Sequence, residues 1–365
     1  MCSKKKRTGT DNAVYNLIRN LPEVDERNRY VIFTTNESRD WFSSFPDQFD
    51  TVNAKLTYPR GIWLWEHLFF YLDPRRNGVD LIYFPQSRGV LGYRGRNVLM
   101  IHDLNAYLGL YNVQFRQYLL YRTWYKANVP NSSMIVTVSE HIKNQITRRF
   151  SVPSHKVRVV HNGVDDRFKP RSKSEAFKKK YGLPARYILF VGSSYGNKNL
   201  KRLIEAHSSL CRKKLLDHHL VIAGGPGDQE DIIQDLVQKN HLQDVVHLFG
   251  YFPDNELPDL YNNAELFVFP ALAEGFGIPP LEAMACGTPV LASDTAVSRE
   301  VLGDSAMMIN PHSTNSIEEG ILGVLSTESL RNELKRRGAE RVKKFSWKRT
   351  ASEMVKVFEE AGTYR

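Results

Sequence analysis

The sequence predicts an α/β protein of two domains, each built around a parallel sheet. Its 365 residues fit two domains at about 150 residues per domain. Short apolar runs alternate with helical patterns along both halves of the chain, which is the arrangement of successive βαβ units. The composition, 42% hydrophobic and 25% charged, is that of a chain that buries a core, and it excludes a disordered or collagen-like protein.

The first half contains five apolar runs of strand length: Tyr30–Thr34, Leu81–Phe84, Asn97–Ile101, Met134–Val138 and Val157–Val160. Apolar residues at helical spacing predict three helices, Asn12–Leu21, Gln114–Tyr125 and Ser139–Phe150, with Ser139 as an N-cap. A connector from Asp165 to Pro170 then predicts a domain boundary near residue 165.

The alternation restarts in the second half. The predicted strands are Tyr187–Val191, His219–Ala223, Val245–Phe249, Leu266–Phe269 and Pro289–Ala292. The predicted helices are Leu200–Leu210, Asp228–Lys239 and Leu257–Asn263, followed by helical pattern from Ser329 onward with an interruption at Phe345–Trp347. Two α/β domains of similar size predict a ligand cleft between them.

Positive charge is concentrated in the first half of the chain. Residues 1–165 contain 23 Lys and Arg against 14 Asp and Glu, a balance of +9 out of a total of +10. This balance favours contact with anionic material such as a phospholipid surface or a phosphate-bearing substrate. A basic surface that only aids solubility fits equally well.

The cysteines and the apolar segments predict a cytoplasmic protein. Cys2, Cys211 and Cys286 lie far apart, form no CxxC pair and give no disulfide framework, as expected in a reducing compartment. No stretch approaches the ~20 apolar residues of a membrane span. No apolar segment follows the basic N-terminus, so we expect no secretory signal.

The loop after the strand Leu266–Phe269 carries the most information about chemistry. Ligands of open α/β sheets bind at the carboxyl ends of the strands, and this loop lies at such an end. Gly275 and Gly277 allow the backbone to approach a ligand closely. Pro279 or Pro280 suits the first turn of a short helix. The free N–H groups of that turn favour a phosphate.

Two carboxylates, Glu274 and Glu282, frame this loop. One carboxylate can accept hydrogen bonds from two vicinal hydroxyls, which suits a sugar or a ribose. The alternative is that Glu282 only complements the helix dipole and that Glu274 is a solvated loop residue.

Two further strand ends carry polar side chains. After Tyr187–Val191, Lys198 precedes a helix that Asn197 or Asn199 can cap. An ammonium at this position stabilises a leaving diphosphate, unless Lys198 is an ordinary exposed lysine. His102, with Asp103, ends the strand Asn97–Ile101, where it either bonds a sugar hydroxyl or has a purely structural role.

These motifs, taken in order, resemble those of the family 4 retaining glycosyltransferases. The clearest is Glu274 to Glu282 with Gly-Phe-Gly between the glutamates, similar to the E-x7-E region of that family. The others are Ile101-His102-Asp103-Leu104, Val138-Ser139-Glu140, Val159 to Asp165, Val191-Gly192-Ser193, Lys198-Asn199-Leu200, Leu257 to Tyr261 and Phe345-Ser346-Trp347. Asn197 stands where arginine is usual in the family. The resemblance runs from about residue 9 to the end of the chain.

The resemblance implies a GT-B architecture, in which two Rossmann-like domains face each other across a cleft. Residues 1–165 would bind the acceptor, residues 166–347 the nucleotide-sugar, and helix 348–365 would cross back to the first domain. The implied reaction moves a hexose, with mannose as the first choice, from a GDP- or UDP-linked donor to a saccharide or lipid-linked acceptor. It retains the anomeric configuration and belongs to cell-surface polysaccharide or glycolipid synthesis. We expect no metal, no cofactor and no nucleic-acid partner, and no Asp-x-Asp follows an apolar strand.

The resemblance also assigns roles by position. Glu274, Lys198 and His102 would be catalytic, with Glu274 on the transferred sugar, Lys198 on the diphosphate and Glu282 on the ribose. The implied donor-binding set is Gly192, Ser193, Lys198, Gly250, Tyr251, Glu274, Gly275, Phe276, Gly277, Ile278 and Glu282, of which Phe276, Gly277 and Ile278 would act through backbone N–H groups. The implied acceptor side is Gly9, Thr10, His102 and Asp103.

The N-terminus departs from the family pattern. The family begins with an apolar strand before a glycine loop, whereas polar and basic residues, Ser3–Arg7, precede Gly9 here. We therefore expect the first strand to be absent and Thr8-Gly9-Thr10 to form the loop. The alternative function is a catalytically impaired protein that binds a nucleotide-sugar. A dinucleotide oxidoreductase is disfavoured because no G-x-G-x-x-G opens a helix after the early strands.

The segment Tyr107–Tyr125 mixes aromatic residues with Arg116 and Arg122. Such a helix can dock at the inner face of an anionic membrane, which would make the protein a peripheral one and its acceptor lipid-linked. The alternative is a helix that packs on the sheet.

Overall fold

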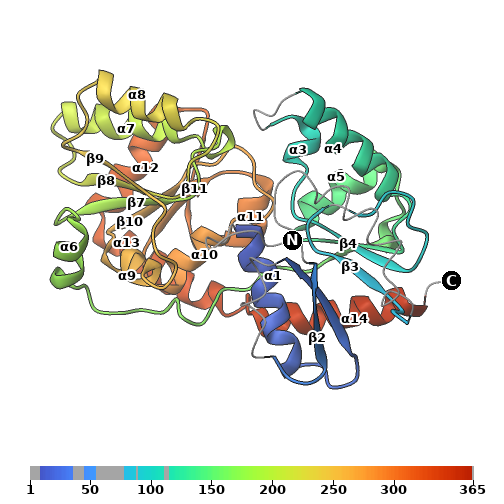
Figure 1. Cartoon of the computed structure of the whole chain (residues 1–365). Coiled ribbons are helices and arrows are strands. Elements are labelled where there is room, and N and C mark those ends of the chain that lie inside the picture. Colours follow the sequence, from blue (N-terminus) through green and yellow to red (C-terminus); the bar gives the residue numbers. More distant parts are fainter. Residues whose placement is uncertain (1–8, 36–44, 55–77, 88, 111–114, 364–365) are drawn as a thin grey trace. The chain divides into compact units, whose positions relative to one another are not determined.

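The computed structural model describes residues 9–35, 45–54, 78–87, 89–110 and 115–363, and the chain divides into two compact units (Figure 1). The first unit consists of Met1–Tyr107, Gln114–Gly163 and Ser346–Arg365, and the second of Leu108–Val113 and Val164–Phe345. Each unit is α/β with parallel strand pairs, as predicted.

The second unit is built on a six-stranded parallel sheet in the order β9-β8-β7-β10-β11-β12. Its strands are β7 (Tyr187–Val191), β8 (His219–Ala223), β9 (Val246–Gly250), β10 (Leu266–Phe269), β11 (Val290–Ser293) and β12 (Met307–Ile309). The first strand in sequence lies in the middle, and the chain leaves it toward both edges in turn. This is the strand order of a Rossmann fold.

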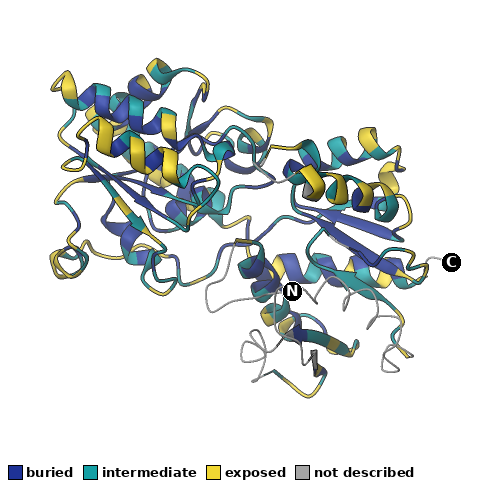
Figure 2. Ribbon diagram, turned by 45° about the horizontal axis from the view of Figure 1, so that its top comes forward, coloured by how far each residue is buried: buried dark blue, intermediate teal, exposed yellow. Residues whose placement is uncertain are grey.

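Helices cover both faces of this sheet (Figure 1). They are α6 (Glu175–Tyr181), α7 (Leu200–Arg212), α8 (Glu230–Lys239), α9 (Leu257–Asn263), α10 (Ile278–Ala285), α11 (Ala296–Leu302), α12 (Thr314–Ser326) and α13 (Glu328–Val342), with a 3-10 turn, η5 (Gly196–Lys198), before α7. The strands β7, β8, β10 and β11 are therefore buried on both sides, whereas the edge strand β9 exposes Leu248 and Gly250; the outer faces of the helices are largely exposed (Figure 2). The predicted strands Tyr187–Val191, His219–Ala223 and Leu266–Phe269 are confirmed to the residue.

The first unit contains two separate parallel sheets within the described residues. One pairs β1 (Tyr30–Thr35) with β2 (Phe49–Ala54), and the other has the order β3-β4-β5-β6. The strands of the larger sheet are β3 (Ile82–Phe84), β4 (Asn97–Ile101), β5 (Met134–Thr137) and β6 (Val157–Val159). We predicted five of these six strands but expected a single sheet. β2 was missed because its sequence, FDTVNA, is not a continuous apolar run.

The helices of the first unit include the chain's C-terminal one. They are α1 (Gly9–Asn20), α3 (Asn105–Leu108), α4 (Phe115–Asn128), α5 (Glu140–Phe150) and α14 (Trp347–Thr363), with short 3-10 turns η1 (Leu21–Glu23) and η4 (Ser154–Lys156). Ser139 caps α5 as predicted, since its side chain accepts a hydrogen bond from the Ile142 N–H at 3.3 Å.

The helix α14 is fixed to this unit by contacts far apart in sequence. The Thr350 hydroxyl donates to the His161 carbonyl at 2.7 Å, and the rings of Tyr83 and Phe358 lie 5.4 Å apart. A Cβ on Gly163 would lie 2.2 Å from the Trp347 nitrogen, so only glycine allows the chain to pass α14 here. The last helix thus crosses back to the first unit, as expected from the resemblance.

Candidate functional site

The loops that the sequence singled out meet at the centre of the second unit's sheet. β7 and β10 are neighbours there, and the chain leaves them toward opposite edges. Such a switch point opens a crevice outside the carboxyl ends of the strands, where open α/β sheets bind ligands. The loop from Gly192 follows β7, and the loop from Pro270 follows β10.

These two loops bring Lys198 and Glu274 into contact. The Lys198 ammonium is paired with the Glu274 carboxylate, and each side chain is 19% exposed. The ammonium also lies 5.3 Å from the centre of the Phe269 ring, which favours a cation at that position. A positive and a negative group are thus held side by side at the rim of the sheet, and one can contact an anion while the other accepts hydroxyl hydrogen bonds.

Two asparagines that flank Lys198 hold its loop against the Pro270 loop. The Asn197 carbonyl accepts from the Leu272 N–H at 2.7 Å, and the Asn197 side-chain amide donates to the Ala273 carbonyl at 2.9 Å. The Asn199 amide donates to the carbonyls of Pro270 and Pro311, at 3.0 and 2.8 Å.

The expected capping role of these asparagines is wrong. Asn199 does occupy the N-cap position of α7, but its side chain makes no cap hydrogen bond, because Oδ1, the atom that would accept one, accepts from the Arg202 guanidinium at 2.8 Å instead. Its two amide hydrogens go to the distant carbonyls of Pro270 and Pro311. No local sequence pattern predicts the hydrogen bonds from Asn199 to carbonyls so far away in the chain. The one sequence feature that could have indicated a structural role is the asparagine on each side of Lys198.

Backbone contact between strand ends positions Gly192. Its N–H donates to the Ala223 carbonyl at 2.9 Å, and a Cβ on Gly224 would lie 2.0 Å from the Gly192 oxygen. The Gly224 N–H in turn donates to the Gly250 carbonyl at 2.6 Å. Gly224 therefore lies between Gly192 and Gly250. Ser193 follows Gly192 in the chain, and the half-buried Tyr251 follows Gly250.

The loop after β10 ends in the helix α10. Gly277 is its N-cap, with φ of 87°, a conformation that favours glycine. Pro279 and Pro280 stand in the first turn, as predicted, but they carry no N–H. The first turn therefore offers the N–H groups of Ile278 and Leu281 alone, fewer than the sequence argument assumed.

The residues before α10 differ in what they present. Phe276 is 5% exposed, and its ring packs against Phe345 at 5.7 Å. Its side chain therefore belongs to the core, and Phe276 can contact a ligand through its backbone alone. Gly275 lies between Phe276 and Glu274 in the same loop.

Glu282 stands in the second turn of α10 beside a buried tyrosine. The Tyr261 hydroxyl donates to its carboxylate at 2.9 Å. Burial raises the pKa of Glu282 to about 7, although the Tyr261 hydrogen bond and the charge of Arg167 act in the opposite direction. The same burial and the neighbouring carboxylate raise the pKa of Tyr261 well above its usual value. Tyr261 was missed because the sequence only placed it on a helix.

The predicted acceptor residues lie in the first unit. The His102 Nε2–H donates to the Pro85 carbonyl at 3.0 Å, and burial lowers the His102 pKa. His102 is therefore a neutral imidazole whose Nδ1 can accept a hydroxyl hydrogen. Asp103 accepts the Asn105 N–H at 2.8 Å, at the start of α3.

Gly9 and Thr10 are the first two residues of α1. The expected loop at these two residues is therefore wrong, because they already have helical conformation. The third residue of that expected loop, Thr8, lies outside the described residues.

Comparison with known proteins identifies the family. Residues 7–168 match the family described as Glycosyltransferase Family 4, and residues 173–341 match the one described as Glycosyl transferases group 1. The chain belongs to the family 4 glycosyltransferases.

Relatives of this glycosyltransferase include two O-antigen enzymes. It is 29% identical over 297 residues to O-antigen chain mannosyltransferase B of Escherichia coli, with 79% of this chain and 78% of that protein covered. It is 33% identical over 228 residues to O-antigen chain mannosyltransferase RfbU of Salmonella typhimurium, with 62% of this chain and 60% of that protein covered. Its structure resembles HepE of Anabaena in complex with UDP and glucose, with a TM-score of 0.75, 14% identity and 98% of both chains covered. The glycosyltransferase thus has the GT-B fold.

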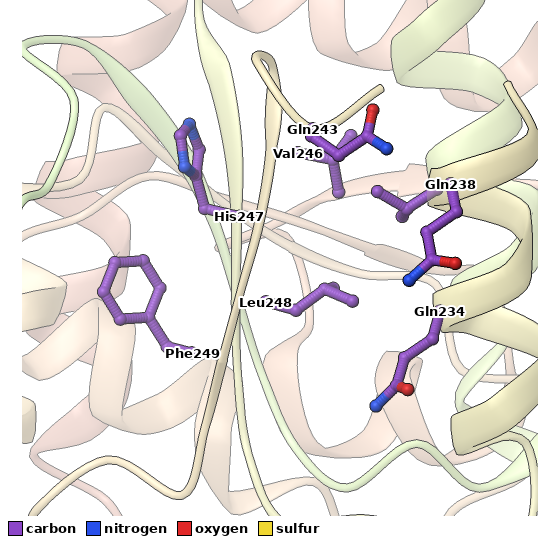
Figure 3. Close-up of a pocket in the computed structure, with 8 residues that line it drawn as sticks. Gln234, Gln238, Gln243, Val246, His247, Leu248 and Phe249 are labelled. Carbon is purple, nitrogen blue, oxygen red and sulfur yellow. The ribbon is translucent and has the colours of Figure 1, made fainter. Parts of the chain in front are cut away.

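A cavity of about 380 Å³ lies elsewhere on the same unit of the glycosyltransferase, between α8 and β9 (Figure 3). Leu248 and the amides of Gln234 and Gln238 line it, together with Val237, Gln243, Val246, His247 and Phe249. Its lining contains no lysine or arginine, so it lacks the fixed cation that a diphosphate requires.

No helix within the described ranges is long and apolar enough to cross a bilayer.

Proposed function

We propose that this glycosyltransferase is a retaining hexosyltransferase that moves mannose from a nucleotide-sugar, GDP- or UDP-linked, to a saccharide or lipid-linked acceptor. The observation that carries the proposal is the Lys198–Glu274 pair at the switch point of a Rossmann sheet. The names of the two O-antigen mannosyltransferases support mannose and a place in cell-surface polysaccharide or glycolipid synthesis. The complex of HepE with UDP and glucose supports a nucleotide-sugar donor.

Lys198 acts on the leaving group in this proposal. The bond between the sugar C1 and the diphosphate oxygen breaks, C1 bonds to the acceptor hydroxyl oxygen, and the hydroxyl proton leaves with the diphosphate. Negative charge develops on that diphosphate, and a fixed ammonium in a half-buried site stabilises it. Lys198 supplies this charge from the protein itself, so we propose a reaction without a resident metal or cofactor.

The carboxylates hold the hydroxyl groups of the donor. Glu274 leaves its partner Lys198 to the diphosphate and accepts sugar hydroxyls, together with the N–H groups of Phe276, Gly277 and Ile278. Glu282, held by Tyr261, accepts the two ribose hydroxyls. Gly192 and Ser193 lie against the diphosphate, and Gly250 and Tyr251 lie near the base.

The first unit contributes the acceptor side. Neutral His102 accepts a sugar hydroxyl through Nδ1, and Asp103, Gly9 and Thr10 lie toward the acceptor. We propose that the protein works in the cytoplasm, at the inner face of the membrane. Its free thiols, Cys211 and Cys286, fit a reducing compartment.

Binding and turnover of a nucleotide-sugar panel test the proposal. We expect GDP-mannose or a UDP-hexose to raise the melting temperature, because a ligand of the native state stabilises it. Lys198→Ala, Glu274→Ala and Glu282→Ala should each lower transfer roughly ten- to a hundredfold, since a hydrogen bond to a charged group contributes about 1.5–3 kcal/mol.

Lys201→Ala, an exposed lysine on α7, is the matched control and should transfer normally. Full activity in all three site variants would refute the assignment. Donor binding without transfer or hydrolysis would instead show the impaired binding protein, and the two sheets of the first unit are the feature that favours this alternative.

A further inference from the structure

The helix α4 is apolar on two opposite faces, and one of them packs inward. Trp124 and Tyr125 are 6% and 4% exposed. The Tyr125 ring stacks on Phe150 of α5 at 6.1 Å, and its hydroxyl donates to the Asp103 carbonyl at 3.1 Å. This inner face is what a helix packed on the sheet requires, and it leaves the opposite face unexplained.

The outer face of α4 carries apolar side chains in water. Phe115, Leu119 and Leu120 are 71%, 46% and 49% exposed, and Phe115 has the largest exposed fraction of any large apolar side chain in the described part of the chain. Arg116, Thr123 and Lys126 are also exposed among the residues of this helix whose burial the structure describes. At 3.6 residues per turn, all six positions fall within an arc about 140° wide. We call these six residues the α4 outer face.

The helix α4 and the stretch of sequence that contains it are strongly basic. The helix carries Arg116, Arg122 and Lys126 and no acidic residue. Residues 81–165 contain 11 Lys and Arg against 3 Asp and Glu, a balance of +8. The neighbouring helix α5 adds exposed Arg148 and Arg149 in its last turn.

We propose that the α4 outer face docks on an anionic phospholipid bilayer. Phe115, Leu119 and Leu120 enter the boundary between headgroups and acyl chains, while Arg116 and Lys126 contact lipid phosphates. Charge complementarity favours a lipid surface over a second copy of the chain. Apolar side chains next to cations match a negatively charged bilayer, whereas a dimer through this face would bring like charges together. Membrane docking is independent of the transfer reaction. Only one consequence of it, the delivery of a lipid-linked acceptor to the first unit, rests on the proposed function.

Cosedimentation of the full chain with vesicles tests the docking. We expect wild-type protein to pellet with vesicles of mixed phosphatidylcholine and phosphatidylglycerol and to stay in solution with phosphatidylcholine alone. The triple change Phe115→Ser, Leu119→Ser, Leu120→Ser should lower the partition coefficient more than tenfold. The double change Arg116→Gln, Lys126→Gln should lower it about 25-fold, at about fivefold for each cation removed.

Matched controls come from elsewhere on the surface. Leu215→Ser and Ile232→Ser alter apolar side chains that are 57% and 49% exposed in the second unit, and Lys356→Gln alters an exposed lysine of α14. These three should bind vesicles like the wild type. Circular dichroism and the melting temperature verify that every variant folds.

Three results would overturn the docking surface. The first is equal binding of the wild type to neutral and anionic vesicles, and the second is wild-type protein that never pellets with vesicles. The third is a wild-type dimer in sedimentation equilibrium that the α4 variants lose, which would assign the face to a second copy of the chain. Donor turnover on a soluble acceptor is measured without vesicles. A failure of the docking proposal therefore leaves the transfer proposal standing, and the reverse also holds.

Discussion

Replacing Glu282 by glutamine should make the protein more stable at neutral and alkaline pH while it weakens donor binding. The carboxyl has a pKa of about 7 in the folded protein against an ordinary value of 4.5, because burial disfavours its charged form. The folded state therefore binds more protons than the unfolded chain between these values. The free energy of unfolding of the wild type consequently falls as pH rises from about 4.5 to about 7.

The structure sets the size of this effect. At about 1.4 kcal/mol for each pKa unit, ionising Glu282 costs up to about 3 kcal/mol above pH 7. Glutamine has the same shape and still accepts from the Tyr261 hydroxyl, but it does not ionise. Glu282→Gln should therefore match the wild type near pH 4.5 and gain up to about 3 kcal/mol near pH 8.

Urea unfolding of both proteins across this pH range measures the gain. The control is Glu319→Gln, which alters an exposed glutamate of α12 and should show no pH-dependent difference. The donor affinity of Glu282→Gln should fall roughly tenfold or more, because the amide can accept from the ribose hydroxyls less strongly than a carboxylate. A stability difference that stays constant from pH 4.5 to pH 8 would contradict the burial argument.

Three further changes probe the loops and the tyrosine. Gly224→Ala should destabilise the protein by more than about 2 kcal/mol, because the new Cβ would lie 2.0 Å from the Gly192 backbone oxygen. Gly225→Ala is the control and should be tolerated, because its Cβ would lie 3.9 Å from the Ser193 side chain. Thermal unfolding compares the two variants. Asn199→Ala removes two buried hydrogen bonds and should cost about 2–3 kcal/mol in urea unfolding as well as most of the transfer activity, and an unchanged midpoint would refute this. Tyr261→Phe removes a donor that lowers the Glu282 pKa, so the pH midpoint of donor binding should move up by roughly one unit, with affinity recovered at higher pH; an unmoved midpoint would show that Tyr261 has only a packing role.

The sequence predicted the sheet of the second unit well because the strands β7, β8, β10 and β11 are buried on both faces. Such strands are continuous apolar runs, and Tyr187–Val191 ends at a glycine, so both the element and its limits are visible locally. The short strand β12 and the helix α6 were missed because neither has a strong pattern of its own. Tertiary packing decides their structure.

The candidate site was predictable as two loops but not as an assembly. Lys198 and Glu274 are both visible in the sequence, yet their contact spans 76 positions and depends on β7 and β10 being neighbours. Asn199 and Tyr261 also act through partners that are remote in sequence, the Pro311 carbonyl 112 positions away and the Glu282 carboxylate 21 positions away. Residue spacing along the chain carries no information about such distant pairs. The sequence therefore predicted a wrong role, helix capping, for Asn199 and no role for Tyr261.

The two prolines of α10 have a consequence for the ionic conditions in which the protein works. Because Pro279 and Pro280 remove backbone donors from that first turn, recognition of a diphosphate in the proposed reaction would depend mainly on the point charge of Lys198. The Lys198 side chain is 19% exposed, and the attraction between such a partly exposed ammonium and an anion is screened over about 8 Å at physiological ionic strength. The Michaelis constant for the donor should therefore rise with added potassium chloride, and the catalytic rate would follow the salt content of the cell.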